Sequence, residues 1–120
     1  MHNNYYFLRI VARELDVRLR NYRLVSCFSQ TRDELVIEFH KQQHHFFIRA
    51  SLLPELPSVS FPSSIKRARK NSVDLFADVV MRHVESARSY ENDRSFSITL
   101  EGGLGLLFKM HGNRANVLLT

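Results

Sequence analysis

The sequence predicts an α+β fold: a two-layer antiparallel β-sandwich with an N-terminal helix and a second helix. Three observations predict it. Apolar residues recur at steps of three and four near the start and again in the middle of the chain, which is typical of amphipathic helices. Elsewhere apolar and polar residues alternate, which is typical of strands with one buried face. Polar or glycine-containing breaks separate the alternating segments, which indicates antiparallel hairpins.

The first helix is expected from about residue 4 to residue 20. Asn3 or Asn4 can cap it, because a short side-chain oxygen accepts a hydrogen bond from a free first-turn amide. Its apolar face consists of Leu8, Val11, Ala12, Leu15 and Leu19.

Three strands should follow, at residues 22–29, 35–39 and 45–50, the first two forming a hairpin. Residues 53–70 contain all three prolines and keep no period, so they are expected to form a loop.

The second helix is expected from about Ser72 to Ala87. Its apolar stripe would consist of Val73, Phe76, Ala77, Val80, Val84 and Ala87. Further strands are expected at residues 95–100, 104–110 and 115–120, the first two joined by a turn at Gly102-Gly103.

The composition indicates one domain with a core. The chain has 120 residues, of which 44% are hydrophobic, and no apolar run approaches the roughly 18 residues that a membrane helix needs. The sequence stops within an apolar run, so we expect a single partial domain, the N-terminal fragment of a longer chain. Its start lacks the pattern of a secretory signal and Cys27 is its only cysteine, so we expect a cytoplasmic protein without a disulfide.

The charge balance favours polyanionic partners. Lys and Arg number 17 against 12 Asp and Glu, a net charge of +5. The run Lys66, Arg67, Arg69 and Lys70 lies in the predicted loop, where flexible cations suit backbone phosphates; a solvated surface run is the equal alternative.

Enzyme and cofactor motifs are not apparent. The Gly102-Gly103 region lies between strands, so we interpret it as a turn rather than a phosphate loop. His40 and His44 lie across a strand turn, where two histidines can approach each other as metal ligands do. Together with His45 they fit no zinc-binding spacing. We therefore interpret all three as solvated turn histidines and predict no metal site. Cys27 is interpreted as a small buried hydrophobe.

Several groups of residues carry a resemblance to a known family. They are Phe7-Leu8-Arg9 and Glu14-Leu15 near the start, residues 33–36, Phe76, Arg82-His83 and Arg88, then Asn92-Asp93-Arg94 and residues 110–119. In this order they resemble the N-terminal domain of the fibronectin-binding-protein-A / NFACT family across nearly the whole chain.

This resemblance implies a fold like the N-terminal β-sandwich of formamidopyrimidine-DNA glycosylases. It also implies a non-enzymatic role in ribosome-associated quality control: binding tRNA and a large ribosomal subunit that still carries peptidyl-tRNA, without a cofactor, so that a C-terminal tail is added to the nascent chain. The family's Asp-Arg pair maps onto Asp93 and Arg94. An arginine can fork onto phosphate or stack on a base, and a neighbouring aspartate can orient it.

One segment departs from the family pattern. Before the last strand only Gly112 and Asn116 match that pattern, and a basic residue, Arg114, is displaced by one position. Arg114 is still a candidate for phosphate binding.

Two other functions are alternatives. A fibronectin-binding surface adhesin is disfavoured because the first residues offer no export signal. A DNA glycosylase would need an N-terminal proline amine, whereas this sequence begins Met1-His2-Asn3, so only a DNA-binding domain without activity would remain.

Overall fold

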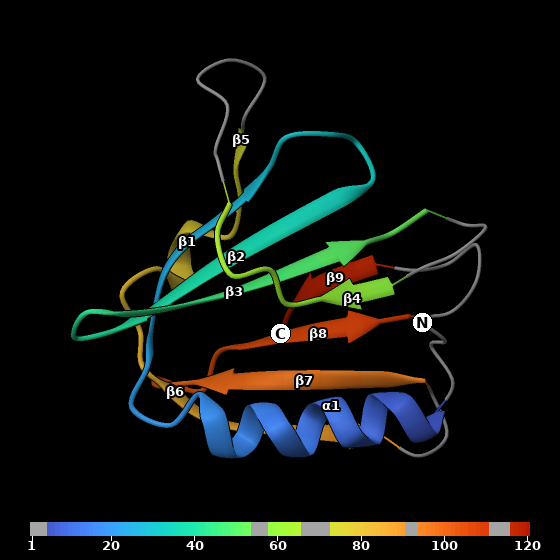
Figure 1. Cartoon of the computed structure of the whole chain (residues 1–120), viewed down its shortest axis with the longest axis horizontal. Helices are drawn as coiled ribbons and strands as arrows, with labels where there is room; N and C mark the ends of the chain where they lie inside the picture. The colour runs from blue at the N-terminus through green and yellow to red at the C-terminus, as the bar shows by residue number, and fades with distance from the viewer. Residues whose placement is uncertain (1–4, 54–57, 66–72, 91–93, 111–115) are drawn as a thin grey trace.

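The computed structural model of the chain describes residues 5–53, 58–65, 73–90, 94–110 and 116–120. These residues form one α-helix, a short 3-10 helix and nine strands (Figure 1). In chain order they are α1 (Tyr5–Arg18), β1 (Arg23–Ser29), β2 (Glu34–Lys41), β3 (His44–Ser51), β4 (Ser58–Ser60), β5 (Val73–Asp74), η1 (Ala77–Val79), β6 (Val84–Tyr90), β7 (Ser95–Leu100), β8 (Gly105–Lys109) and β9 (Asn116–Leu119).

The first half of the chain supplies most of a five-stranded antiparallel sheet with the order β4-β3-β2-β1-β5. β2 and β3 are joined by a two-residue turn, and Gln42 in this turn adopts a left-handed φ of 56°. The turn sets the register, so that His40 faces His45 and Ile37 faces Ile48. The predicted hairpin and third strand are therefore confirmed.

The second half supplies a four-stranded antiparallel sheet with the order β6-β7-β8-β9. The turn predicted between β7 and β8 is confirmed: Gly102 and Gly103 have φ of 87° and 80°, which only glycine adopts without strain. Gly102 also lies against Arg82, whose Nη1 would be 2.4 Å from an added Cβ.

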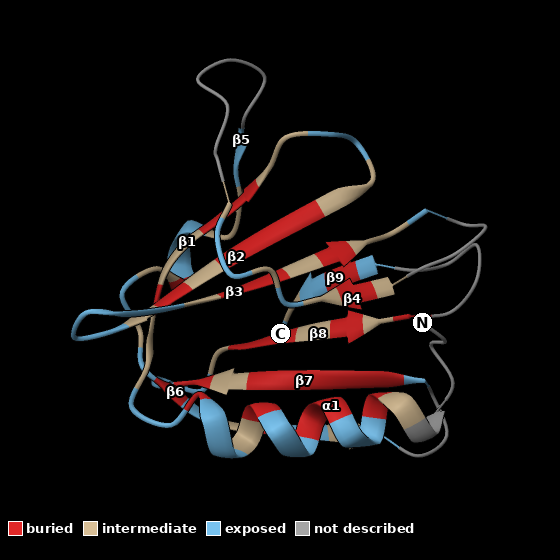
Figure 2. Cartoon of the chain, viewed as in Figure 1, coloured by how far each residue is buried: buried red, intermediate tan, exposed pale blue. Residues whose placement is uncertain are grey.

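The two sheets share one core. Buried side chains from both sheets form a continuous cluster with the inner face of α1, and Figure 2 shows this buried stripe along the helix. α1 packs against β6 and β7 and runs beside them along one side of the molecule (Figure 1). The five helix and post-helix residues Leu8, Val11, Ala12, Leu15 and Leu19 are all buried, as their spacing predicted.

A backbone junction joins the sheets at one corner. The amide of Leu24 in β1 donates to the carbonyl of Arg82 at 3.0 Å, and the amide of Val84 in β6 donates to the carbonyl of Tyr22 at 2.9 Å. These bonds join the start of β1 to the start of β6, so they fix the position of the five-stranded sheet relative to the four-stranded sheet at this corner.

The predicted fold class is wrong in its second helix. The segment expected to be helical from Ser72 to Ala87 contains β5, the single 3-10 turn η1 and the beginning of β6. Phe76 and Met81, with φ of 51° and 72°, turn the chain between these pieces. The described residues are mostly β, with α1 as their one α-helix.

A β-bulge explains why the helical pattern was misleading. β6 has an irregular register between Val84 and Ser86, which places Val84 and Ala87 on the same, inward face of the strand. Two buried residues three positions apart therefore occur in a strand, at the spacing that a helix would also give. Ser86, the serine between them, is only a middling helix former, and this weak preference does not outweigh the helix-like spacing.

α1 and β6 are also linked by a polar contact that yields a stability prediction. The Oδ1 atom of Asp16 accepts a hydrogen bond from the amide of Ala87 at 2.8 Å, on an edge strand whose amide has no neighbouring strand on that side. We expect Asp16→Ala to lower the free energy of unfolding by about 1–3 kcal/mol, because a half-buried amide loses its acceptor. Asp16→Asn keeps an acceptor oxygen and should lose less. Urea denaturation would measure both, and equal stability of the alanine variant and the wild type would contradict this role.

Candidate functional site

The outward surface of the four-stranded sheet, which we call the outer face of β6–β9, combines cations, hydroxyls and an aromatic ring. Its members share a side of the sheet because directly paired residues and residues two apart along a strand point the same way. The described members are Arg88 and Tyr90 from β6, Ser95, Ser97 and Thr99 from β7, Leu107 and Lys109 from β8, and Asn116 and Leu118 from β9.

These residues form rows across the sheet. Tyr90, Ser95, Lys109 and Asn116 are paired in register from strand to strand at one end, and Arg88, Ser97, Leu107 and Leu118 form the next row. Each row therefore carries a basic residue and a hydroxyl side by side, on the face opposite to the core.

A hollow of about 700 Å³ lies over this face. Arg88, Tyr90, Ser95, Ser97 and Thr99 line it, and it extends over Leu107 to the β7–β8 turn. Of the described residues that line the hollow, none is acidic. Among these described lining residues an anionic ligand would therefore meet hydroxyls and a guanidinium.

Side-chain contacts organise the hollow. The Tyr90 hydroxyl shares a hydrogen bond with Ser97 Oγ at 2.9 Å, and the Arg88 guanidinium lies over the Tyr90 ring, 5.5 Å from its centroid. Ser95 is only 1% exposed, and its Oγ has no hydrogen-bond partner within the described protein. A buried hydroxyl without a partner costs free energy, which a polar ligand group or a water molecule in the hollow would offset.

Arg94 adjoins this surface. It is exposed, has a φ of 34° in the turn directly before Ser95, and its carbonyl accepts a hydrogen bond from the Met110 amide at 3.1 Å. The contact holds the start of β7 beside the end of β8. Asp93, its predicted partner, lies outside the described residues, so the Asp93–Arg94 pair remains a prediction.

The predicted phosphate-binding cations also lie outside the described residues. They are Lys66, Arg67, Arg69, Lys70 and Arg114. The described residues on either side of the segments that hold Asp93 and Arg114 are Tyr90, Arg94, Met110 and Asn116, and they lie at one end of the four-stranded sheet.

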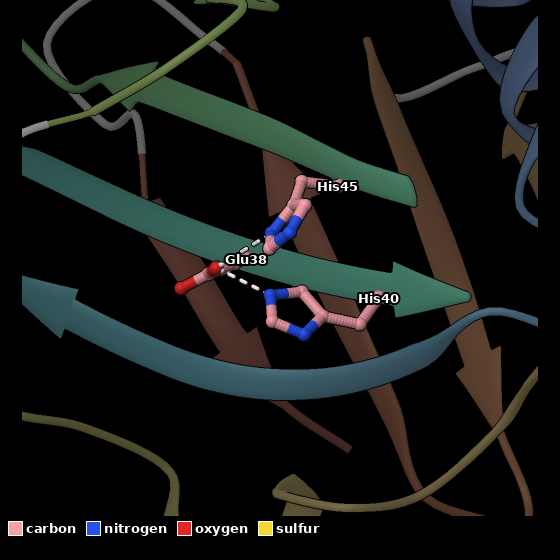
Figure 3. Close-up of side chains that lie close together, drawn as sticks. All are labelled: Glu38, His40 and His45. Carbon is pink, nitrogen blue, oxygen red and sulfur yellow. Dashed lines mark hydrogen bonds and ion pairs between the residues drawn. The ribbon is translucent and has the colours of Figure 1, made fainter. Parts of the chain in front are cut away.

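His40 and His44, which the sequence places across a strand turn, do not face each other in the structure. His40 faces His45 across the β2–β3 hairpin, whereas His44 faces Lys41 and belongs to the other side of the sheet. Glu38, two residues before His40, completes a cluster of three side chains (Figure 3). A two-residue turn at 42–43 implies this register, and that signal could have identified the cluster from the sequence.

The carboxylate of Glu38 is the centre of this cluster. Its Oε2 lies 2.5 Å from His40 Nε2 and 3.4 Å from His45 Nδ1, and Ser26 Oγ donates to its Oε1 at 3.3 Å. Partial burial raises the pKa of Glu38, but the hydrogen bonds from the two histidines and from Ser26 outweigh it and leave this pKa below its usual value.

Cys27 is buried in the core and 2% exposed, as predicted for a small hydrophobe. Burial, followed by the negative charge of Asp74, raises the pKa of its thiol from 9.0 to about 12. At neutral pH the thiolate is therefore scarce, and Cys27 is not a candidate nucleophile. None of the helices within the described ranges is long and apolar enough to cross a membrane.

Comparison with known proteins identifies the fold. The chain superposes on the N-terminal domain of the fibronectin-binding protein PavA from Streptococcus pneumoniae with a TM-score of 0.82 and 21% sequence identity, covering 98% of this chain and 49% of that one. This chain has the fold of about half of that domain. The fibrinogen-binding protein from Staphylococcus aureus matches with a TM-score of 0.78 and 16% identity, covering 100% and 47% of the two chains.

Both matches are consistent with the resemblance to the N-terminal domain of the fibronectin-binding-protein-A / NFACT family. This chain spans about half the length of each of the two matched structures. No family model matches the sequence, and no curated protein matches it either. At identities of 21% and 16%, the likeness establishes the fold, while the ligands in the names of PavA and the staphylococcal protein belong to those proteins.

Proposed function

We propose that this chain is a non-catalytic RNA-binding module of a ribosome-associated quality-control factor in the cytoplasm. In this role it contacts tRNA on stalled large ribosomal subunits that carry peptidyl-tRNA and supports C-terminal tailing of the nascent chain. The observation that carries the proposal is the outer face of β6–β9. Arg88 and Tyr90 line its hydroxyl-rich hollow, no described lining residue is acidic, and Lys109 lies on the same face, paired with Ser95.

The chemistry of this face suits RNA. Proteins read single-stranded loops of RNA by stacking bases on aromatic rings and guanidinium planes and by hydrogen bonds to base edges and 2′-hydroxyls. Tyr90 supplies a ring at the rim of the hollow, and Ser95, Ser97 and Thr99 supply hydroxyls that both donate and accept. Arg88, Arg94 and Lys109 supply positive charge for the backbone phosphates. Holding RNA in this way requires no bond to be broken.

The predicted Asp93–Arg94 pair would act at the rim of the same face. Arg94 directly precedes Ser95, whose unpartnered hydroxyl lines the hollow. A guanidinium at this position can form two parallel hydrogen bonds to a phosphate or stack on an unstacked base. Arg94 is the neighbour in sequence of Ser95, which lines the hollow. The sequence-based site and the surface therefore support one binding region.

A second candidate is adhesion. Two proteins with this fold are named for binding fibronectin and fibrinogen, respectively, which favours a protein ligand of the extracellular matrix or plasma. We rank adhesion second. The hydroxyls and positive charges on the outer face of β6–β9 suit a polyanionic ligand, whereas adhesion rests only on the names of two structures that are 21% and 16% identical to this chain.

The proposal is tested by replacing Asp93 and Arg94 together with alanine in the full-length protein in cells. We expect C-terminal tails on a stalled reporter chain to be lost, because the guanidinium that would grip tRNA is removed. Arg32→Ala with Asp33→Ala is the matched control, since it removes the same two charges from the β1–β2 loop and should leave tailing intact. Normal tailing by the Asp93/Arg94 variant at normal protein level would contradict the role of this pair.

A further inference from the structure

Three potential metal ligands meet on the outward side of the five-stranded sheet, on the other sheet from the proposed RNA surface. His40 and His45 are directly opposite each other in the β2–β3 hairpin, and Glu38 precedes His40 by two residues on the same side. Figure 3 shows the two imidazole rings and the carboxylate pointing toward one another. Their ligand atoms all lie within 4.8 Å of one another.

The spacing is close to that of a tetrahedral zinc site. Bonds of about 2.0–2.1 Å to nitrogen and oxygen place neighbouring ligand atoms about 3.4 Å apart. Glu38 Oε2 and His45 Nδ1 are already 3.4 Å apart. Glu38 Oε2 and His40 Nε2, at 2.5 Å, are at hydrogen-bond distance and would separate by about 1 Å when a metal ion replaces the shared proton. His40 is partly exposed, so its ring has room for this movement.

Neighbouring side chains support the three ligands. Ser26 Oγ donates to Glu38 Oε1, which leaves Oε2 turned toward the histidines. The His45 ring stacks on Phe47 with an interplanar angle of 14°, and the His40 ring meets His45 edge-on with centroids 4.0 Å apart. Such outer contacts orient metal ligands and commonly change metal affinity by about 10–100-fold.

The ligand set and its charge select the class of ion. Two imidazoles and one carboxylate are typical ligands of Zn²⁺, whereas Mg²⁺ and Ca²⁺ prefer oxygen ligands throughout. Arg23 faces His40 from β1, and both residues line a separate pocket on this sheet, so an ion held mainly by charge would be repelled. We propose that Glu38, His40 and His45 form a zinc-binding site with a fourth position open to solvent.

The direct test is titration of the tag-free 120-residue chain with Zn²⁺ by isothermal titration calorimetry, with Mg²⁺ as a parallel arm. We expect one Zn²⁺ per chain and no heat of binding for Mg²⁺. Glu38→Gln and His45→Ala should each weaken Zn²⁺ binding at least about 10-fold, because each removes one of three ligands. His45 is about half exposed, with a side-chain exposure of 49%, so its replacement should not disturb folding.

His44→Ala is the matched control. It removes a neighbouring exposed histidine that faces Lys41 on the other side of the hairpin, and it should keep wild-type Zn²⁺ affinity within about 2-fold. Zn²⁺ should also raise the Tm of the wild type and of His44→Ala but not that of Glu38→Gln, because a ligand that binds only the folded state stabilises it. Absence of Zn²⁺ binding, wild-type affinity in Glu38→Gln or His45→Ala, or an equal loss in His44→Ala would overturn the proposal.

Discussion

Replacing Phe96 by alanine is expected to lower the free energy of unfolding by about 3–5 kcal/mol. Phe96 on β7 and Phe108 on β8 are cross-strand partners, both fully buried, and their rings stack with centroids 4.5 Å apart and an interplanar angle of 4°. The substitution removes a large apolar side chain from the core, leaves a cavity and ends the ring contact. Because a domain of this size is stable by only about 5–15 kcal/mol, a substantial part of its stability should be lost.

Phe61→Ala is the matched control for this loss. Phe61 follows β4, is 40% exposed and touches Phe46 at a ring-centroid distance of 5.7 Å. Its replacement should cost less than about 1.5 kcal/mol, since a large part of the residue, 40%, is already in contact with water and less apolar area is lost from the core. Urea denaturation of both variants gives the comparison. Equal losses in Phe96→Ala and Phe61→Ala would contradict the placement of Phe96 between the two sheets.

The variant Arg88→Gln with Lys109→Gln is expected to weaken tRNA binding at least about 10-fold at low salt, equivalent to about 1.4 kcal/mol. Both cations belong to the outer face of β6–β9, one in each of two adjacent rows. If each contacts one phosphate, their removal also lowers the slope of log affinity against log salt by about 2 in magnitude. Fluorescence anisotropy of labelled tRNA over a series of salt concentrations measures both quantities.

The control for this experiment changes the charge equally at the other sheet. Arg32→Gln with Lys41→Gln removes an exposed arginine from the β1–β2 loop and an exposed lysine from the end of β2. If only the net charge of the protein mattered, both double variants would lose the same tRNA affinity. A defined binding surface predicts a loss of tRNA affinity in Arg88→Gln/Lys109→Gln alone. Equal affinities and equal salt slopes in the two variants would contradict the proposed surface.

The first helix and the hairpins could be predicted from sequence because their signals are local. The buried positions of α1 recur at helical spacing, and the alternation along β2 and β3 matches the register found. The second helix could not be excluded in this way. A bulge at Val84–Ser86 is decided by pairing with β7, so the spacing of Val84 and Ala87 is ambiguous until the partner strand is known.

The same ambiguity concealed much of the candidate site. Arg88 and Tyr90 share a face with Ser95, Ser97 and Thr99 only because residues 84–90 form a strand beside β7. A helix over that segment would not place Arg88 beside Ser97. The histidine cluster was missed for a related reason, since one residue of register decides whether His44 or His45 faces His40. Arg94, in contrast, was identified through the family resemblance, which does not depend on register.

Binding of tRNA by the tag-free wild-type chain, measured by anisotropy between about 50 and 200 mM salt, tests the central claim most directly. We predict saturable binding whose log affinity falls linearly with log salt, with a slope of about −2 to −3 if Arg88, Arg94 and Lys109 each contact a phosphate. Fibronectin at the same concentrations serves as the competing ligand. Binding of fibronectin together with no binding of tRNA at the lowest salt concentration would contradict the account.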